Sequence, residues 1–369
     1  MIIHFSILGV ILLVSSLYER RVRKIASINI IENKNFITKS LPWILVFGYL
    51  AFLAAMRTDM NDSYAYIHSF KLLDASWATF IQQITEREKD WAFYAVATLF
   101  KMYISDDYHL WFAFYAIIES LAFVHILRRS AVSFKDCCYF FFCSTLYYNY
   151  FSMMRQWFAI VILFGSSRLI AEKKTFRYIL LCLIMAQFHN SAYLMIPIYF
   201  LVQGKAWAQK QLLMIFSFVV LMIFLNPILN SMENMSGLTY NYAISAMNAS
   251  AGSSSMRILI ALVPVLISYI YRTKEPNRMI NVCMNVSVIN LLLNIMARFT
   301  SGLYIIRFST YISIYNMILY PYVMNILLKG SNKKIIKFGF YICYFLFYIY
   351  QMYYQGAFSY ISDILGSYY

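Results

Sequence analysis

The chain has 369 residues, of which 62% are hydrophobic and only 13% are charged, whereas a soluble domain typically carries about 25% charged residues. This composition excludes a soluble enzyme. Together with apolar stretches of about 15 to 25 residues from end to end, it predicts an all-α polytopic membrane protein. The formal net charge is +15, but the basic residues gather in short loops between apolar runs, which indicates membrane topology rather than nucleic-acid binding.

The predicted membrane spans follow one another along the whole chain. Residues 2–18 form the first, and they lack the positively charged n-region and the small-residue cleavage site of a signal peptide, so we expect a retained span. Further spans are predicted near residues 41–56, 108–127, 134–152, 156–171, 211–228, 257–271, 279–297, 304–328 and 335–354.

Residues 178–202 fit either one long helix or a hairpin broken at the polar sequence QFHNS, residues 187–191. The hairpin places the basic loops on one side, which is the asymmetry that the positive-inside rule gives to cytoplasmic loops. The resulting topology is a single domain, residues 1–369, of about twelve spans with both termini outside. Two longer loops, residues 57–107 and 230–256, then also lie outside.

The first outer loop carries half of the acidic residues of the protein. Within it, the run WAFYAVATLFKMYI, residues 91–104, is too short to span a bilayer comfortably and contains Lys101, so we predict an interfacial or re-entrant helix. Glu86, Glu88 and Asp90 precede this helix, where the helix dipole favours acidic side chains. That local effect accounts for the three acids.

An Arg-Gln pair, Arg155 and Gln156, stands in the otherwise apolar run YYNYFSMMRQWFAIVI, residues 147–162. Arginine at the centre of a membrane helix costs roughly 2.5 to 3.5 kcal/mol on insertion scales, so such residues usually line a cavity or pair with another group. The predicted topology puts Arg155 at the outer end of two adjoining spans. There it either binds an anion or extends its guanidinium to lipid phosphates.

The sequence RTDMNDSYAY, residues 57–66, directly follows the second span. If it is helical, Asp59, Asp62 and Tyr66 lie on one face and form a polar edge on a cavity. The alternative is helix capping, with Asp59 at the N-cap and Asp62 in the first turn. Capping does not explain Arg57.

His189 lies beside Asn190 and Ser191 where the predicted hairpin turns. A neutral imidazole is a competent proton acceptor for a sugar hydroxyl, and a structural histidine hydrogen-bonded to a carbonyl is the alternative. Arg298 and Arg307 flank an outer turn between two late spans. They add positive charge to the same outer surface, unless one of them serves only as an interfacial anchor.

The outer face therefore combines arginines, a few carboxylates, one histidine and many aromatic residues around an outward-facing cavity. This set suits a lipid-linked sugar phosphate, because guanidinium groups bind phosphate oxygens, aromatic faces stack on sugar rings, and a carboxylate or imidazole activates a hydroxyl. The six cysteines fall in apolar runs without metal or redox spacing, and no nucleotide-binding motif occurs.

Five motifs in order along the chain resemble the EpsG family of Wzy-type polysaccharide polymerases. They are R-x-D-x-x-D-x-Y at 57–64, E-x-D-W-x-F at 88–93, FSMMRQWFA at 151–159, FHNSA at 188–192 and RFSTY at 307–311. The most specific part is RQ-x-x-A followed by FH-x-SA. The chain departs from the family pattern at Ser152 and Met153, where relatives often have Asn, and it lacks the glycine common after the first Arg.

The resemblance implies a glycosyltransferase of the bacterial cytoplasmic membrane. Such an enzyme joins undecaprenyl-diphosphate-linked oligosaccharide repeat units on the outer, periplasmic face into capsule, exopolysaccharide or O-antigen. The energy comes from the glycosyl-pyrophosphate bond, so we expect no cofactor and metal-independent transfer. The expected partners are the bilayer, the lipid-linked oligosaccharide, and flippase and chain-length regulator proteins.

The resemblance also implies roles for individual residues. Arg155 and Arg307 bind the pyrophosphate, with Arg57 as an additional candidate; His189 or Asp62 activates the acceptor hydroxyl, and Asp59 orients it. The full set expected to bind substrate is Arg57, Arg155, Gln156, Arg307, Arg298 and Tyr66.

A flippase for lipid-linked oligosaccharides is the alternative, because it handles the same substrate. It should show two similar halves and cationic residues deep within several spans. Here the polar residues gather towards one face.

Overall fold

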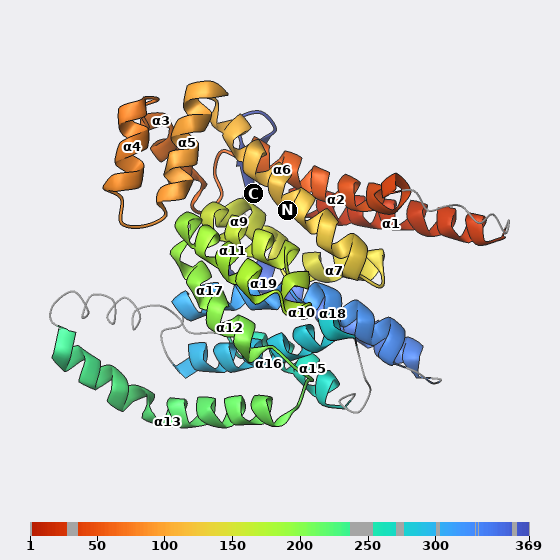
Figure 1. Ribbon diagram of the computed structural model, residues 1–369. Coiled ribbons are helices and arrows are strands. Elements are labelled where there is room, and N and C mark those ends of the chain that lie inside the picture. The colour runs from red at the N-terminus through yellow and green to blue at the C-terminus, as the bar shows by residue number, and fades with distance from the viewer. Residues whose placement is uncertain are drawn as a thin grey trace. The chain divides into compact units, whose positions relative to one another are not determined.

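The computed structural model describes residues 2–27, 36–236, 254–270, 277–299, 303–328, 330, 332–355 and 360–368 (Figure 1). Apart from one small β-hairpin, the regular structure in these residues is helical, which confirms the predicted class. The chain divides into two compact units. The first comprises Met1–Ser167, Phe176–Tyr193 and Tyr320–Tyr369, and the second comprises Arg168–Thr175 and Leu194–Leu319.

Among the described residues, four helices are long and apolar enough to cross a membrane by length and composition. Shorter apolar helices occupy most of the other predicted spans. The four long helices are α1 (Ile2–Ser27), α6 (Tyr108–Ser130), α16 (Arg278–Phe299) and α19 (Lys333–Gln355). The shorter apolar helices include α9 (Met154–Gly165), α11 (Thr175–Phe188) and α15 (Ser255–Ile270). Shorter apolar stretches also lie within two longer helices: Ser40–Met56 in α2 (Phe36–Met56) and Gln209–Phe224 in α13 (Gln209–Ser236). The number of spans, the outward-facing cavity and the orientation of the termini stay predictions.

Two of the predicted spans are not single continuous helices, because the chain breaks inside them. Residues 134–152 begin as α7 (Phe134–Cys143), but Thr145 has a φ of 61°, and a 3-10 turn and the short α8 (Asn149–Ser152) follow. Residues 304–328 divide instead into α17 (Leu303–Ser313), α18 (Asn316–Tyr322) and a π-helical turn, Val323–Leu327, that follows Pro321. A left-handed residue interrupts the first of these helices. In the second, a turn at Ile314 and Tyr315 separates α17 from α18.

The break predicted at QFHNS is confirmed. Helix α11 ends at Phe188, a 3-10 turn (Asn190–Leu194) follows, and α12 (Met195–Leu201) begins directly after it. One continuous helix over residues 178–202 is therefore excluded. His189 lies at the break itself.

The core of the first unit forms where α2 and α6 pack along each other and against α9. Phe47 of α2 stacks on Phe123 of α6 with 4.7 Å between ring centroids, and Trp157 of α9 lies 5.9 Å from Phe123. All three rings are fully buried. A Cβ on Gly165 would lie 3.1 Å from the Ala122 Cβ of α6, so this glycine permits the close approach of α9. The packing fixes the helix whose first turn carries Arg155.

The first outer loop contains three short helices, α3 (Ser63–Leu72), α4 (Trp77–Thr85) and α5 (Trp91–Tyr103). Helix α5 packs on α6 through Phe93 and Phe100, whose rings lie 5.6 and 5.1 Å from that of Trp111. The Lys101 Nζ donates hydrogen bonds to three carbonyl oxygens at the end of α3. This cation at a helix C-terminus explains the lysine in an otherwise apolar run.

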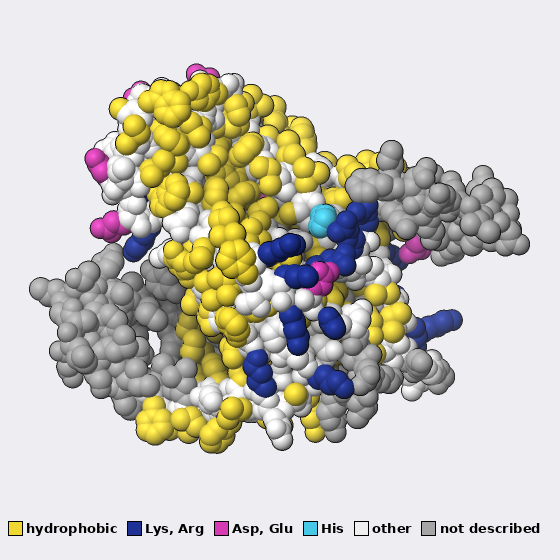
Figure 2. Space-filling view, viewed as in Figure 1, with side chains coloured by type: hydrophobic (Ala, Val, Ile, Leu, Met, Phe, Trp, Pro, Cys, Tyr) yellow, Lys and Arg dark blue, Asp and Glu magenta, His cyan; other side chains and the backbone are white. Residues whose placement is uncertain are grey.

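Helix α4 differs from α5 because none of its residues is buried. Trp77 and Ile81 are 55% and 56% exposed. In the space-filling view, hydrophobic side chains cover much of the surface over α3 to α5, with acidic groups at its margin (Figure 2). An exposed apolar face on a short helix suits the lipid headgroup region. The interfacial placement predicted for residues 91–104 stays a prediction for α5.

The second unit packs around α15 and α16. Ala261 and Val265 of α15 form a buried cluster with residues of α16, among them Val288. The Asn285 side chain of α16 donates to the Val202 carbonyl oxygen at 2.9 Å. Of the predicted second outer loop, residues 237–253 lie outside the described part of the chain.

The chain ends in an antiparallel hairpin of β1 (Tyr360–Ser362) and β2 (Gly366–Tyr368). Gly366 has a φ of 91°, a conformation that glycine adopts without strain. A bridge joins Ile361 to Asp59, so the hairpin lies against the segment that follows α2. No sequence pattern predicted this hairpin.

Candidate functional site

Asp90 joins three segments that are far apart in the sequence. Its Oδ2 atom accepts a hydrogen bond from Arg155 Nη1 at 2.8 Å, and its Oδ1 atom accepts one from the Asn190 backbone N–H at 3.0 Å. The His189 Nδ1 atom lies 3.6 Å from the same Oδ2. One carboxylate therefore bonds an arginine and faces a histidine. We call Asp90, Arg155 and His189 the Asp90 cluster.

The backbone of Asp90 shows that helix capping does not explain this residue. It occupies the N-cap position of α5 with a φ of 56°, and its side chain makes no capping hydrogen bond. Aspartate is one of the few residue types besides glycine that adopt the left-handed conformation, and surrounding contacts hold the Asp90 backbone there. The bonds to Arg155 and Asn190 are such contacts.

Arg155 reaches Asp90 because α9 begins at Met154, one residue before Arg155. Met153 has a φ of −124° and a ψ of 55°, which separates α8 from α9 and leaves Arg155 in the first turn of the new helix. Gln156, the next residue, is buried. The irregular residue therefore positions the guanidinium at the end of α9 rather than within a continuous span.

Aromatic rings surround the Arg155 guanidinium. Its carbon lies 5.6 Å from the ring centroid of Tyr66 and 5.6 Å from that of Tyr94, and Phe93 is at 5.9 Å. The Tyr94 hydroxyl accepts a hydrogen bond from Nη1 at 3.3 Å. A cation near ring faces is attracted to them, at about 0.5 to 2 kcal/mol per contact. Burial raises the pKa of the Tyr66 hydroxyl, so it stays protonated at neutral pH.

Two hydrogen bonds tie the chain on either side of His189 to the start of α5. The Trp91 Nε1 donates to Gln187 Oε1 at 2.6 Å, and Asn190 N–H donates to Asp90. The His189 backbone N–H still bonds to Met185 O at 2.9 Å as the last turn of α11. These two contacts therefore hold the helix break at QFHNS against the start of α5 in the first outer loop.

The electrostatics of the Asp90 cluster keep its carboxylate ionised. Burial alone would raise the pKa of Asp90, but the neighbouring His189 imidazole and the Arg155 guanidinium together outweigh burial and hold that pKa below its ordinary value. The Asp90 side chain is only 11% exposed, whereas those of Arg155 and His189 are 28% and 27% exposed. The acid is thus shielded, and its two partners remain accessible.

The His189 Nδ1 atom has no hydrogen-bond partner among the described residues, but it faces the Asp90 carboxylate at 3.6 Å. A carboxylate only accepts hydrogen bonds, so the Nδ1 atom that faces Asp90 is assigned the proton in the neutral ring. The Nε2 atom then carries the lone pair and is the atom able to accept a proton from a bound hydroxyl. An ionised carboxylate beside the ring also stabilises the imidazolium that forms.

The structure brings together three residues predicted from sequence: Arg155, His189 and Tyr66. The predicted polar face of a helix over residues 57–66 is wrong, because α3 begins only at Ser63. Asp59 instead pairs with Ile361, and the capping alternative fails for it too.

Asp62 occupies the N-cap position of α3 without a side-chain capping bond, and it is exposed. Arg298 and Arg307 are exposed residues of the second unit.

Arg57 lies in a different setting from Arg155. It is 2% exposed, its Nε donates to Ser63 Oγ at 3.0 Å, and its Nη1 donates to the Ala54 carbonyl. Its guanidinium lies 4.0 Å from the ring centroid of Phe112, and Glu119 of α6 interacts with it electrostatically. These contacts support a positioning role rather than direct contact with substrate.

Sequence reasoning missed Asp90, Asn190, Gln187 and Tyr94 as members of the site. The signal for Asp90 was present in the E-x-D-W-x-F motif, but acids before a helix have a local explanation. Among the described residues, no group of three or more His, Cys, Asp or Glu is arranged to hold a metal.

A comparison with protein families gives one match. The EpsG family model covers residues 40–362, which is most of the chain and includes the whole Asp90 cluster. The chain belongs to the EpsG family.

For this EpsG protein, neither a curated protein nor a solved structure gives a match. The family supports a polymerase-type function in polysaccharide synthesis. The apolar helices agree with a membrane location.

Proposed function

We propose that this EpsG protein is a polysaccharide polymerase that transfers a growing glycan between undecaprenyl-diphosphate-linked repeat units on the outer face of the bacterial cytoplasmic membrane. The observation that carries the proposal is the Asp90 cluster, where one shielded carboxylate bonds a half-buried arginine and faces a histidine. Capsule, exopolysaccharide and O-antigen are all products of this chemistry.

His189 acts as the general base in the proposed reaction. Its Nε2 takes the proton of the acceptor sugar hydroxyl while the hydroxyl oxygen attacks the anomeric carbon of the donor. The bond from that carbon to the phosphate oxygen breaks, and its electron pair leaves with undecaprenyl diphosphate. Asp90 keeps Nδ1–H oriented and stabilises the imidazolium. Asp62, exposed at the start of α3, is the alternative base, and Asp59 is a candidate for orienting the acceptor.

Arg155 stabilises the departing diphosphate. Its Nη1 is engaged by Asp90 and Tyr94, and the side chain is 28% exposed. A guanidinium has five N–H donors, so donors remain for phosphate oxygens. Charge stabilisation of a leaving group in a partly dry site is usually the largest contribution to catalysis.

Other predicted residues keep weaker roles in the proposal. Tyr66 and Tyr94 offer ring faces beside Arg155 for stacking on sugars. Gln156 is a buried neighbour of Arg155. Arg298 and Arg307 enter the proposal only through the sequence pattern, and Arg57 supports the site from within the core.

The test is chain growth by purified protein in liposomes supplied with a defined lipid-linked repeat unit, without added nucleotide or divalent metal. We expect the wild type to make long glycans and His189→Ala to make none. The matched control is His68→Ala, which removes a histidine of α3 in the same outer loop. Growth that persists in His189→Ala would contradict the assignment. Movement of single units across the membrane without growth would favour a flippase.

A further inference from the structure

The C-terminal hairpin is docked as an added strand on the first outer loop. The Thr58 N–H donates to Ile361 O at 2.7 Å, and the Ile361 N–H donates to Asp59 O at 3.1 Å. The Tyr360 hydroxyl reaches the Leu53 carbonyl oxygen in the last turns of α2 at 2.7 Å. The end of the chain thereby holds the segment that connects α2 to α3.

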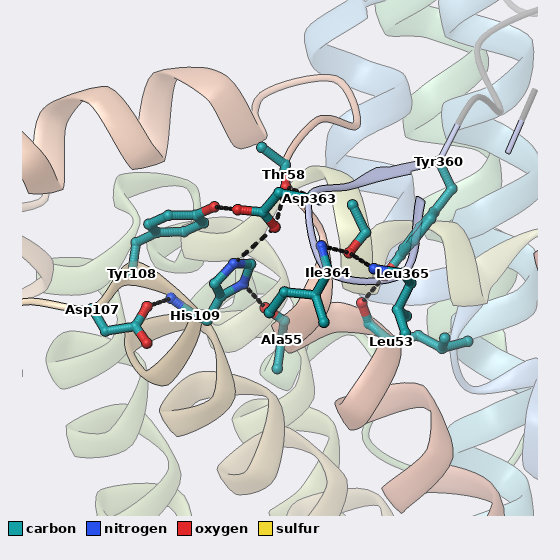
Figure 3. Close-up of polar contacts among 11 residues, drawn as sticks. Leu53, Ala55, Thr58, Asp107, Tyr108, His109, Tyr360, Asp363, Ile364 and Leu365 are labelled. Atoms are coloured by element: carbon teal, nitrogen blue, oxygen red, sulfur yellow. Dashed lines mark hydrogen bonds and ion pairs between the residues drawn. The ribbon is translucent and has the colours of Figure 1, made fainter. Parts of the chain in front are cut away.

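Asp363, in the turn of this hairpin, is the centre of its polar contacts (Figure 3). Its Oδ1 accepts from Thr58 Oγ1 at 2.8 Å, and its Oδ2 accepts from the Tyr108 hydroxyl at 2.7 Å. The His109 Nε2 lies 3.0 Å from Oδ1. One side chain thus connects the hairpin to the segment after α2 and to the first turn of α6.

His109 lies between two acceptors. Its Nδ1 is 2.7 Å from the Ala55 carbonyl oxygen, which only accepts hydrogen bonds, so Nδ1 carries a hydrogen. Its buried Nε2 lies 3.0 Å from the Asp363 Oδ1 atom without forming a hydrogen bond, so this contact acts through charge alone. The contact with Asp363 attracts as an ion pair only when the ring is the doubly protonated imidazolium. A neutral ring places a lone pair against one of the two oxygens.

The charged groups near His109 come from the hairpin, from the start of α6, from the segment after α2 and from α3. Asp363 faces the ring from the hairpin, and Asp107 accepts a hydrogen bond from the His109 backbone N–H. Two cations lie on neighbouring turns: the Arg57 guanidinium over the ring of Phe112 at 4.0 Å, and Lys71 Nζ 5.0 Å from the Tyr108 ring. Of these groups, Asp363 contacts the imidazole directly.

Asp363 is ionised over the range in which imidazoles titrate. Burial alone would raise the pKa of its carboxyl, but the hydrogen bonds from Tyr108 and Thr58 and the charge of His109 hold that pKa below its ordinary value. The charge on His109 therefore decides whether the pair attracts.

We propose that His109 and Asp363 form a proton-dependent clasp that closes the C-terminal hairpin on the first outer loop. The clasp is closed when His109 is protonated, and its stabilisation is lost as the pH rises and the imidazole loses its proton. The clasped segment leads directly into α3, which carries Tyr66 of the site, so opening frees the outer loop that surrounds Arg155. The clasp does not depend on which reaction the site performs.

Hydrogen–deuterium exchange of the full-length protein in nanodiscs tests the clasp. Exchange is followed in peptides that contain Thr58, Asp59 and Ile361, whose amide hydrogens are bonded in the closed state. Protection factors, corrected for the intrinsic rate at each pH, are compared from about pH 5 to about pH 8, the range of imidazole titration. We expect protection in the wild type to fall with rising pH by up to about fivefold, the ceiling for an exposed ion pair.

Matched variants test whether the pH dependence of protection comes from His109 and Asp363. His109→Gln and Asp363→Asn should lose the pH dependence and show low protection throughout, whereas His68→Gln, which changes a histidine stacked on Tyr64 in α3, should behave as the wild type. Asp363→Asn answers the question if His109→Gln does not fold. A wild type whose protection is constant with pH overturns the clasp, as does a pH dependence that persists in Asp363→Asn.

Discussion

Two arginines of the first unit, Arg57 and Arg155, have the same predicted role but different surroundings. Arg57 is 2% exposed, and a serine hydroxyl, a backbone carbonyl and a phenylalanine ring occupy its guanidinium. Arg155 is 28% exposed and retains an Nε without a partner in the described structure. A guanidinium buried among protein acceptors holds the fold together, whereas a partly exposed one is accessible to a ligand.

The two arginines are nevertheless connected through Ser63. The Ser63 hydroxyl that accepts from Arg57 lies 3.2 Å from the Phe151 carbonyl oxygen, in the short helix α8 just before Arg155. Arg57 therefore supports the break that places Arg155. The comparison leads to four predictions, in order of decreasing effect.

Replacing Arg57 should unfold the protein rather than only inactivate it. Arg57→Ala removes the partner of several buried groups, and such losses cost roughly 3 to 5 kcal/mol. We expect a much lower yield of monodisperse protein and a lower Tm in detergent. Arg129→Ala, at an exposed arginine of α6, is the control and should leave Tm unchanged. A normal Tm in Arg57→Ala would remove the distinction between the two arginines.

Replacing Arg155 should inactivate without unfolding. Loss of one group that stabilises developing charge costs about 100- to 1,000-fold in rate. We therefore expect Arg155→Ala to keep most of its Tm and to lose chain growth by that factor in the liposome assay. Arg155→Lys should recover part of the rate, since it restores charge without the forked geometry. A large loss of Tm in both variants would instead make Arg155 a second structural arginine.

Replacing Asp90 should have a smaller effect on the rate. Asp90→Asn keeps the shape of the side chain but removes the charge that orients His189, and groups that orient a functional histidine contribute about 10- to 100-fold. The pH profile of chain growth should also shift, because the imidazole loses the neighbouring negative charge. An unchanged rate with an unchanged profile would show that Asp90 only tethers the loop.

Acid should weaken the cluster through Asp90. The folded-state pKa of Asp90 is lowered, so its contribution to stability is fully present above the unfolded-state value of about 3.9 and is lost as the pH falls through the lower folded-state value. Thermal unfolding at about pH 6 and about pH 3 should show a smaller acid effect in Asp90→Asn than in the wild type. Equal acid sensitivity in the two proteins would contradict this linkage.

The contrast between the arginines also shows what the sequence can and cannot predict. Periodicity and charge located the helices, the break at QFHNS and two of the three residues in the Asp90 cluster, because these signals are local. The Asp90 partner of Arg155 lies 65 residues away, and the acid already had a local explanation. Nothing in R-x-D-x-x-D-x-Y distinguishes a buried Arg57 from an accessible one, since that depends on packing against α6.

The hairpin was missed for a similar reason. Its strands are three residues each, and its partners Thr58 and Asp363 are separated by 305 residues. Short strands without alternating hydrophobicity leave no periodic signal. Likewise, Thr145 and the turn at Ile314 and Tyr315 interrupt helices at a few positions, whereas hydropathy is averaged over a whole span.

The most direct test of the account is the affinity of the purified protein for a short-chain prenyl diphosphate, measured by isothermal titration for the wild type, Arg155→Gln and the control Arg129→Gln. If Arg155 is the accessible phosphate-binding arginine, Arg155→Gln should bind at least about tenfold more weakly, the usual worth of a charge-assisted hydrogen bond. Arg129→Gln should bind as the wild type does. Equal affinity in Arg155→Gln and the wild type would contradict the assignment of Arg155 to the diphosphate.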